Sequence, residues 1–159
     1  MPRVSCQTEE SALSRSSQPD ELIVRADASE APRASEWLEA LCSEHGVPRE
    51  HVDRLLLCLD DAFANVLAHG GPTALSHPVR LLFEMNGDPE SRTASVTLSD
   101  SGTAFDPLSA PDKALPKTLD EAVPNGRGLQ MIRAASSVLR YRRKDGRNHL
   151  TFGTRWEQE

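Results

Sequence analysis

The feature that most restricts the fold of this chain is a long apolar segment, predicted to form one helix from Pro48 to Gly70. Between Val52 and Ala68, 12 of 17 residues are apolar, alanine and cysteine included. Proline is favoured at the start of a helix, and the glycine–glycine–proline cluster at 70–72 predicts its end. At about 100° per residue, one apolar stripe runs along the helix and must cover a second layer of structure. The stripe consists of Val52, Leu56, Leu59, Phe63 and Val66.

The opposite face of this helix carries Asp61, Asn65 and His69 at steps of four residues. One interpretation is the solvated side of an amphipathic helix. Against it, residues 55–78 contain no lysine, arginine or glutamate, so the face looks half-buried, and a half-buried carboxylate needs a partner. The three side chains fan over about 80° and can converge on one ligand. A carboxylate can accept a proton from a hydroxyl, and an amide oxygen suits Mg²⁺. The helix therefore indicates where a site would lie.

Around this helix the sequence predicts five strands and two further helices. The strands are expected at 21–27, 79–86, 93–100, 138–144 and 148–156, and the helices at 29–46 and 129–135. Turn residues join the second strand to the third and the fourth to the fifth, which predicts two hairpins. Because helices and antiparallel strands are segregated along the chain, we expect an α+β fold. It would be a two-layer α/β sandwich whose mostly antiparallel sheet is covered by about three helices.

The domain is expected to span residues 21–159. Residues 1–20 are serine-rich and polar and show no periodicity, which predicts a disordered tail. Residues 106–127 contain four of the eleven prolines and are too long for an ordinary loop in a compact domain. Long segments of this kind are often lids over a binding site, and a lid is predicted there.

Composition limits the classes of function. The net charge of −6 argues against direct binding of nucleic acid. Three cysteines without a CxxC pair predict reduced thiols rather than a disulfide or zinc framework. The sequence has no apolar run approaching 18 residues and no apolar signal core, so we expect a cytoplasmic protein without a membrane-spanning helix.

Two glycine-containing motifs follow the long helix. LSDSGTAFDP (98–107) places Asp100 at the end of a strand, where it can accept a hydrogen bond from a ligand amine, and Gly102 can let a ligand approach the backbone. A plain strand-to-turn junction has the same pattern. NGRGLQMIRAA (125–135) leads through Gly126 and Gly128 into a helix start, whose free N–H groups can bind phosphate. The P-loop motif is absent from the sequence.

Taken together and in this order, the three motifs resemble those of the GHKL ATPase superfamily, which includes gyrase, histidine kinases and MutL. Asp61, Asn65 and His69 match its asparagine box. Asp100-Ser101-Gly102-Thr103-Ala104 matches its first glycine box, and Gly126-Arg127-Gly128-Leu129 its second. Residues 20–157 look most like the bacterial anti-sigma-factor serine/threonine kinases, on three points: His69-Gly70, Phe105-Asp106-Pro107 and the Gly-Arg-Gly-Leu-x-x-Ile run. The resemblance implies a Bergerat-type ATP-binding fold.

The resemblance also implies roles for individual residues. Asn65 would hold Mg²⁺ against the phosphates of ATP or ADP, and Asp61 would orient or deprotonate a partner's serine hydroxyl. Asp100 would accept from the adenine amino group, and Gly102 would leave room for the base. For His69, contact with phosphate and capping of the helix are both open. The other nucleotide contacts would be Phe105, Gly126, Arg127, Gly128, Leu129 and Thr151.

Two departures from the family pattern leave two functions open. Asp61 stands where these kinases usually have the longer glutamate, and Ala104 replaces the second glycine of the first glycine box. Phosphoryl transfer depends on positioning, so a misplacement of about 1 Å can cost about a hundredfold in rate. The first hypothesis is an ATP-dependent serine/threonine kinase that phosphorylates a STAS-domain anti-sigma antagonist and sequesters a sigma factor. The second is a nucleotide-dependent binding switch with weak or no kinase activity.

Other readings of the sequence are weaker. A histidine-kinase catalytic domain would need a dimerising helical hairpin, and the residues before position 21 cannot form one. A two-layer domain that binds no nucleotide is the plainest alternative. The resemblance is compatible with a homodimer, since family members are commonly dimers. A basic cluster on the last hairpin is either a solvated, protected edge or a surface for an acidic protein partner. It consists of Arg140, Arg142, Arg143, Lys144 and Arg147.

Overall fold

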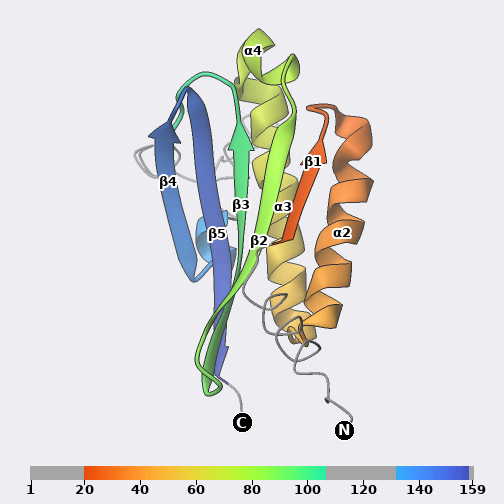
Figure 1. Ribbon diagram of the computed structural model, residues 1–159, viewed down its shortest axis with the longest axis vertical. Coiled ribbons are helices and arrows are strands. Elements are labelled where there is room, and N and C mark those ends of the chain that lie inside the picture. Colours follow the sequence, from red (N-terminus) through yellow and green to blue (C-terminus); the bar gives the residue numbers. More distant parts are fainter. Residues whose placement is uncertain (1–19, 107–131, 158–159) are drawn as a thin grey trace, which may run out of the picture.

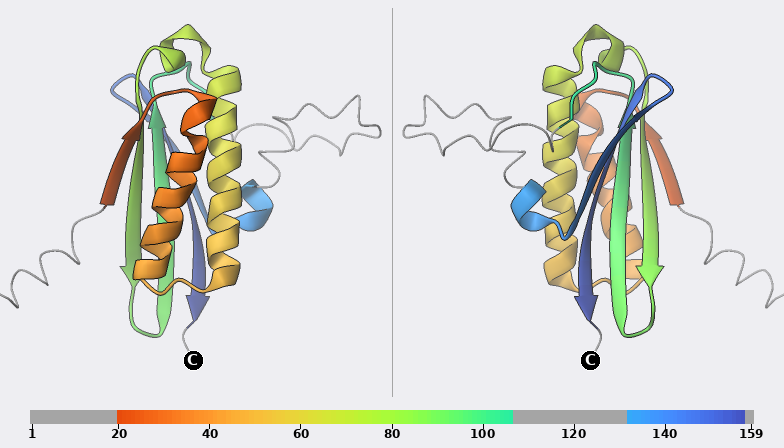
Figure 2. Two further views of the ribbon diagram at one scale, coloured as in Figure 1. Left: turned by 90° about the vertical axis from the view of Figure 1, so that its right-hand side faces the viewer. Right: turned by 90° about the vertical axis from the view of Figure 1, so that its left-hand side faces the viewer.

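The computed structural model describes residues 20–106 and 132–157. Five strands form one antiparallel sheet in the order β1-β2-β3-β5-β4. They are β1 (Asp20–Val24), β2 (Val79–Gly87), β3 (Ser91–Asp100), β4 (Val138–Lys144) and β5 (Arg147–Glu157). Two long helices, α2 (Ala31–Glu44) and α3 (Arg49–His69), cover one face of the sheet (Figure 1, Figure 2). The two-layer α+β fold expected from the sequence is confirmed.

Several boundaries differ from the prediction. Asp20, assigned to the tail, begins β1 and pairs with Phe83. The glycine–glycine–proline cluster ends α3 but not helical structure, because a short helix, α4 (Gly71–Leu75), follows with proline in its first turn. Of the helix predicted at 129–135, residues 132–135 are described and helical. The predicted tail up to residue 19 and the lid from residue 107 to 127 lie outside the described residues.

The core lies between the sheet and the two long helices. On α3 the buried side chains form a wider arc than the predicted stripe, because the helix packs on α2 as well as on β3 and β5. Leu55, outside the predicted stripe, is fully buried, whereas Leu56 is only partly buried. From the sheet, Leu81, Phe83 and Phe152 complete this core, each at most 1% exposed.

Gly46 ends α2 and lies in the short connection that joins it to α3. It has φ +70°, and its N–H donates to the carbonyl of Ser43 at 3.2 Å, while Val47 N–H donates to the carbonyl of Cys42 at 2.9 Å. This is the Schellman arrangement that ends many helices. Pro48 then starts α3 with φ −59°. The short connection makes α3 antiparallel to α2 and fixes the direction in which its polar face points.

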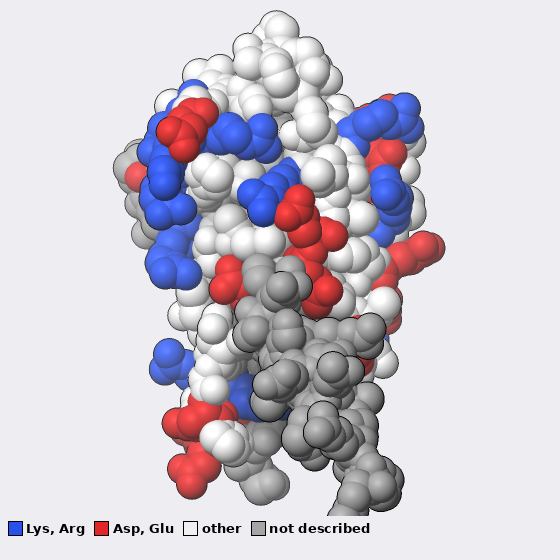
Figure 3. Space-filling view, in the orientation of Figure 1, with Lys and Arg blue, Asp and Glu red and all other residues white. Residues whose placement is uncertain are grey.

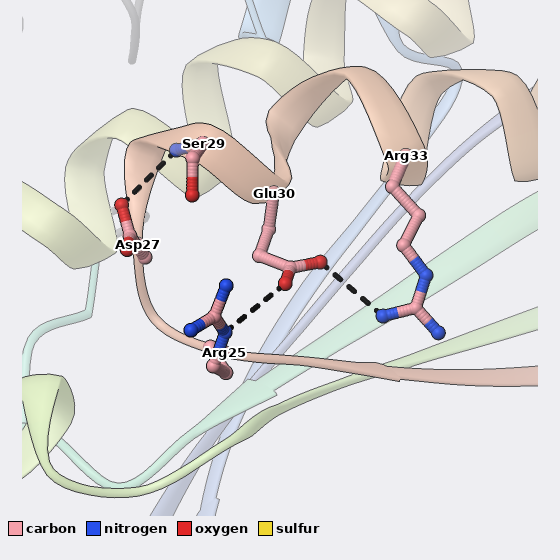
Figure 4. Close-up of polar contacts among 5 residues, drawn as sticks. All are labelled: Arg25, Asp27, Ser29, Glu30 and Arg33. Carbon is pink, nitrogen blue, oxygen red and sulfur yellow. Dashed lines mark hydrogen bonds and ion pairs between the residues drawn. The ribbon is translucent and has the colours of Figure 1, made fainter.

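A small ion-pair cluster joins Arg25, the residue after β1, to the start of α2 (Figure 4). The Glu30 carboxylate is largely buried and accepts from Arg25 Nε and from Arg33 Nη1, both at 3.2 Å. Asp27 Oδ1 accepts from Ser29 N–H at 3.1 Å and caps the 3₁₀ turn (Ala28–Glu30) that precedes α2. That backbone hydrogen bond is the main cause of a lowered Asp27 pKa. Since the arginines are mostly exposed, each pair is worth little more than about 1 kcal/mol.

The described helices contain no candidate membrane span: within residues 20–106 and 132–157, none is both long enough and apolar enough. The space-filling view shows lysine and arginine side chains gathered along the β4 edge of the sheet (Figure 3). The basic cluster predicted on the last hairpin lies on this edge. Among the described strands, β4 is an edge strand and pairs only with β5.

Candidate functional site

A narrow cavity lies between the C-terminal half of α3, the loop after β3, and the β4–β5 hairpin. Its volume is about 50 Å³, small beside the few hundred Å³ of typical ligand pockets. Leu98 and Leu150 contribute apolar walls from the sheet. The polar side chains that line it are Asn65, His69, Thr103, Tyr141 and Asn148. Two of these belong to the asparagine box, so the cavity lies where the long helix predicted a site.

The structure brings together side chains from the first two motifs at this cavity. Asn65 lines it, and its side-chain amide makes no hydrogen bond to any described residue. His69, at the end of α3, stacks on Phe105, with ring centroids 5.8 Å apart and planes 20° from parallel. Phe105 is 40% exposed and also lines the cavity. The stacked pair therefore borders the cavity, next to an amide that is free to bind a ligand.

Asp61 lies one turn before Asn65 and is half-buried. Its Oδ2 atom is buried without a hydrogen-bond partner among the described residues. Burial, and to a lesser extent the neighbouring Asp60 carboxylate, raises the pKa of Asp61 above its ordinary value. An unpaired buried acceptor fits a group that brings a proton or a positive charge. Asp61 is not, however, among the residues that line the cavity.

The raised pKa of Asp61 predicts how its replacement affects stability. The folded protein holds this proton more tightly than the unfolded chain, so ionisation of Asp61 destabilises the fold as pH rises above about 3.8. We expect Asp61→Asn without nucleotide to be more stable than the wild type at pH 7.5, with a difference that narrows as the pH falls to the ordinary aspartate pKa, about 3.8. Denaturant unfolding at both values measures this. Asp60→Asn, which removes only the lesser cause of the raised Asp61 pKa, should give a smaller gain in stability, and an equal, pH-independent change in both variants would contradict the expectation.

Asp100 and Gly102 are both buried, but neither lines the cavity. Asp100 Oδ1 accepts from Gly102 N–H at 2.8 Å and from Asn148 Nδ2 at 3.1 Å. A Cβ atom at Gly102 would lie 2.7 Å from Gly70 Cα and 2.8 Å from Gly70 O, so the missing side chain makes room for the end of α3. Thr103 N–H donates to the same Gly70 carbonyl at 3.1 Å.

Thr151, expected among the nucleotide contacts, does not line the cavity. Its hydroxyl lies 2.7 Å from that of Thr97, its partner on β3. Successive side chains of a strand point to opposite faces, and Leu150 and Phe152 face the helices, so Thr151 faces away from them. The β5 residue that lines the cavity and contacts Asp100 is Asn148, which the motifs did not indicate.

Two residues of the basic hairpin contact the first glycine box. Arg143 Nη1 donates to the carbonyl of Gly102 at 2.7 Å and to Asn148 Oδ1 at 3.1 Å. Arg147 donates to Ser101 Oγ at 2.7 Å and to the carbonyl of Ser99 at 3.0 Å. From sequence these arginines belong either to a solvated, protected edge or to a surface for an acidic protein partner, and neither interpretation predicts these contacts. By the alternation of residues along β4, Arg143 lies on the same face as Tyr141.

Some expected ligands of nucleotide and metal cannot be placed. The second glycine box, Gly126 to Leu129, lies outside the described residues. In the described part of the chain, no group of three or more His, Cys, Asp or Glu side chains could hold a metal ion. Among the described residues, the donor expected for Mg²⁺ is therefore the Asn65 amide oxygen. A single amide oxygen fits Mg²⁺, because this ion commonly takes one or two protein oxygens together with phosphates and waters.

Comparison with known proteins connects this geometry to a family. A family model described as the histidine kinase-like ATPase domain matches residues 24–154. The chain is 34% identical over 141 residues to the serine/threonine-protein kinase BtrW of Bordetella bronchiseptica. The aligned region covers 86% of this chain and 94% of BtrW.

Two solved structures resemble the fold. One contains the RsbU and RsbW domains of a Mycobacterium tuberculosis protein, with a TM-score of 0.64 and 17% identity, over 90% of this chain and 34% of that one. The other is the SiaB–SiaC complex from Pseudomonas aeruginosa, with a TM-score of 0.52 and 10% identity, over 98% of this chain and 100% of that one. At these identities the likeness shows the fold alone.

Proposed function

The chain belongs to the histidine kinase-like ATPase family, together with a serine/threonine-protein kinase, and on that premise we propose that it transfers phosphate from ATP to a partner protein. The acceptor in this proposal is a serine or threonine hydroxyl of a STAS-domain anti-sigma antagonist. Phosphorylation of the antagonist would leave this protein free to bind a sigma factor in the cytoplasm. The observation that carries the proposal is the buried Oδ2 of Asp61, which lies one helical turn from the Asn65 amide. Neither group has a hydrogen-bond partner among the described residues.

Each residue has a part in the proposed transfer. The hydroxyl oxygen of the acceptor attacks the γ-phosphorus, its proton passes to Asp61, and ADP leaves. The raised pKa of Asp61 brings this carboxylate closer to the operating pH, which favours a general base. Asn65 would hold Mg²⁺, which supplies neutralisation of the phosphate charge. Because the cavity is narrow, we propose that the stacked rings of His69 and Phe105 separate when the base enters.

Replacement of Asn65 tests nucleotide binding separately from chemistry. We expect Asn65→Ala to weaken Mg-ATP binding at least about tenfold, since even outer-shell partners of a metal contribute that much. The fold should not lose stability, because the Asn65 amide has no partner among the described residues and alanine favours helices. Calorimetry with Mg-ATP measures the first effect and denaturant unfolding the second. Ala64→Asn, with an amide at the exposed neighbouring position, should leave binding unchanged. Unaltered Mg-ATP affinity in Asn65→Ala would contradict the assignment.

A second candidate function is a nucleotide-dependent binding switch with weak or no kinase activity. It is favoured by the position of Asp61, which carries one methylene fewer than the usual glutamate and does not line the cavity. Incubation with Mg-ATP and a STAS-domain antagonist separates the two functions. Phosphoserine or phosphothreonine on the antagonist supports the kinase, whereas ATP-dependent binding of the antagonist without phosphate on it supports the switch.

A further inference from the structure

Asn148 is the most completely bonded side chain near the cavity. It is 7% exposed, and its Nδ2 donates to Asp100 Oδ1 at 3.1 Å and to the carbonyl of Thr103 at 2.9 Å. Its Oδ1 accepts from Tyr141 Oη at 2.6 Å and from Arg143 Nη1 at 3.1 Å. A side-chain amide has two N–H donors and two lone pairs, so all four positions are used. The amide is therefore held in one orientation.

This orientation determines which oxygen of Asp100 is left without a hydrogen bond from a described residue. Oδ1 already accepts from Asn148 Nδ2 and from Gly102 N–H. No hydrogen bond from a described residue reaches Oδ2. If the Asn148 amide turned over, its oxygen would face Asp100 Oδ1 and the carbonyl of Thr103, and three acceptors would crowd together. The donors of Tyr141 and Arg143 oppose that turn, because they need the amide oxygen on their side.

We propose that Tyr141 and Arg143 are positioning residues for selection of the base. By fixing the Asn148 amide, they hold Asp100 so that Oδ2 remains a hydrogen-bond acceptor toward the nucleotide. A base with an amino group at that point, such as adenine, donates to this oxygen. A base with a carbonyl at the same point, such as hypoxanthine, presents a second acceptor and is disfavoured. The inference rests on the proposed binding of ATP and deepens it.

The strand geometry supplies a matched control. Tyr141 and Arg143 lie opposite Leu150 and Asn148 on β5, on the side of the sheet that faces the helices. Arg142 lies between them on β4, pairs with His149, and points to the other face by the alternation of the strand. It is exposed, as Arg143 is, and forms no hydrogen bond or ion pair with a described residue. Loss of positive charge on β4 is thus separable from loss of the contacts to Asn148.

The test compares the full chain and its variants in binding Mg-ATP and Mg-ITP by calorimetry, with unfolding midpoints measured without nucleotide. We expect the wild type to prefer ATP. Tyr141→Phe and Arg143→Met should each reduce the ATP-to-ITP affinity ratio about five- to tenfold, the effect of about one hydrogen bond. Arg143→Lys, which keeps a donor, should retain more of the ratio than Arg143→Met. Arg142→Met should retain all of it.

The outcomes distinguish this inference from the proposed function. A wild type that binds neither nucleotide overturns both. A wild type that prefers ATP, with the same ratio in Tyr141→Phe and Arg143→Met, overturns only the positioning role. If the variants lost affinity equally for both nucleotides and had lower unfolding midpoints, the two side chains would merely support the fold. That result would also overturn the positioning role. Tyr141→Phe removes one hydroxyl, so it keeps the test valid if Arg143→Met folds poorly.

Discussion

Asp61→Asn is expected to slow phosphoryl transfer by about a hundredfold or more while Mg-ATP affinity is retained, because general bases typically contribute a factor of this size or larger. Asparagine has nearly the same shape as aspartate, but its amide cannot take the proton of the attacking hydroxyl. The buried Oδ2 of Asp61 has no partner among the described residues that would be lost in the replacement. Single-turnover formation of phosphoserine on the antagonist, followed by mass spectrometry, measures the rate, and calorimetry measures the affinity.

Two further variants make this result specific. Asp60→Asn removes the same charge one residue earlier, where the side chain is exposed and, among the described residues, accepts only from Ser35 Oγ, at 3.3 Å. It should leave the transfer rate nearly unchanged. Asp61→Glu restores the length that the related kinases usually have and should retain or raise the rate. Transfer by Asp61→Asn at the wild-type rate would exclude Asp61 as the base. A wild type that binds ATP without transfer, with activity gained in Asp61→Glu, would identify the natural protein as a switch.

Gly102→Ala is expected to lower the free energy of unfolding by about 1–3 kcal/mol, the usual cost of overpacking a tight site. The added methyl group would lie within 2.8 Å of the Gly70 backbone and of Asp100 Oδ1. Backbone atoms cannot turn aside as the end of a flexible side chain can, so the loop after β3 must move away from α3. Since this loop carries Thr103 and Phe105 of the cavity, we also expect Mg-ATP binding to fall.

Gly146→Ala is the matched control for that variant. Gly146 lies in the β4–β5 turn with φ +73°, and no atom lies within 4 Å of the added Cβ. It should cost only about 1 kcal/mol, the strain of a left-handed backbone, and leave Mg-ATP affinity unchanged. Urea unfolding and calorimetry compare the two. If Gly102→Ala lost ATP binding at full stability, the space beside Gly102 would serve the nucleotide after all, as the glycine-box motif alone suggested.

Local patterns were enough to predict most of the fold. Apolar periodicity and the residues at its ends predicted α3 nearly to its observed limits, and turn residues predicted both hairpins. The same periodicity placed Asp61, Asn65 and His69 on one face, and the structure puts two of them on the cavity. These features can be predicted from the sequence because helix geometry alone determines which residues share a face, whatever the helix packs against. The width of the buried arc on α3 cannot be predicted in this way, since it depends on α2 as well as on the sheet.

The sequence by itself therefore determined the α+β fold, its family and the asparagine-box face of α3. Only the tertiary structure decided which residues meet that face from the sheet. A shift of one residue along a strand moves every side chain to the other face, so a sequence pattern without the strand register could not tell Thr151 from Asn148. The contacts of Arg143 with Gly102 and of Gly102 with Gly70 join segments more than 30 residues apart. Such contacts leave no local periodicity, because they depend on how the strands pair and how closely α3 approaches them.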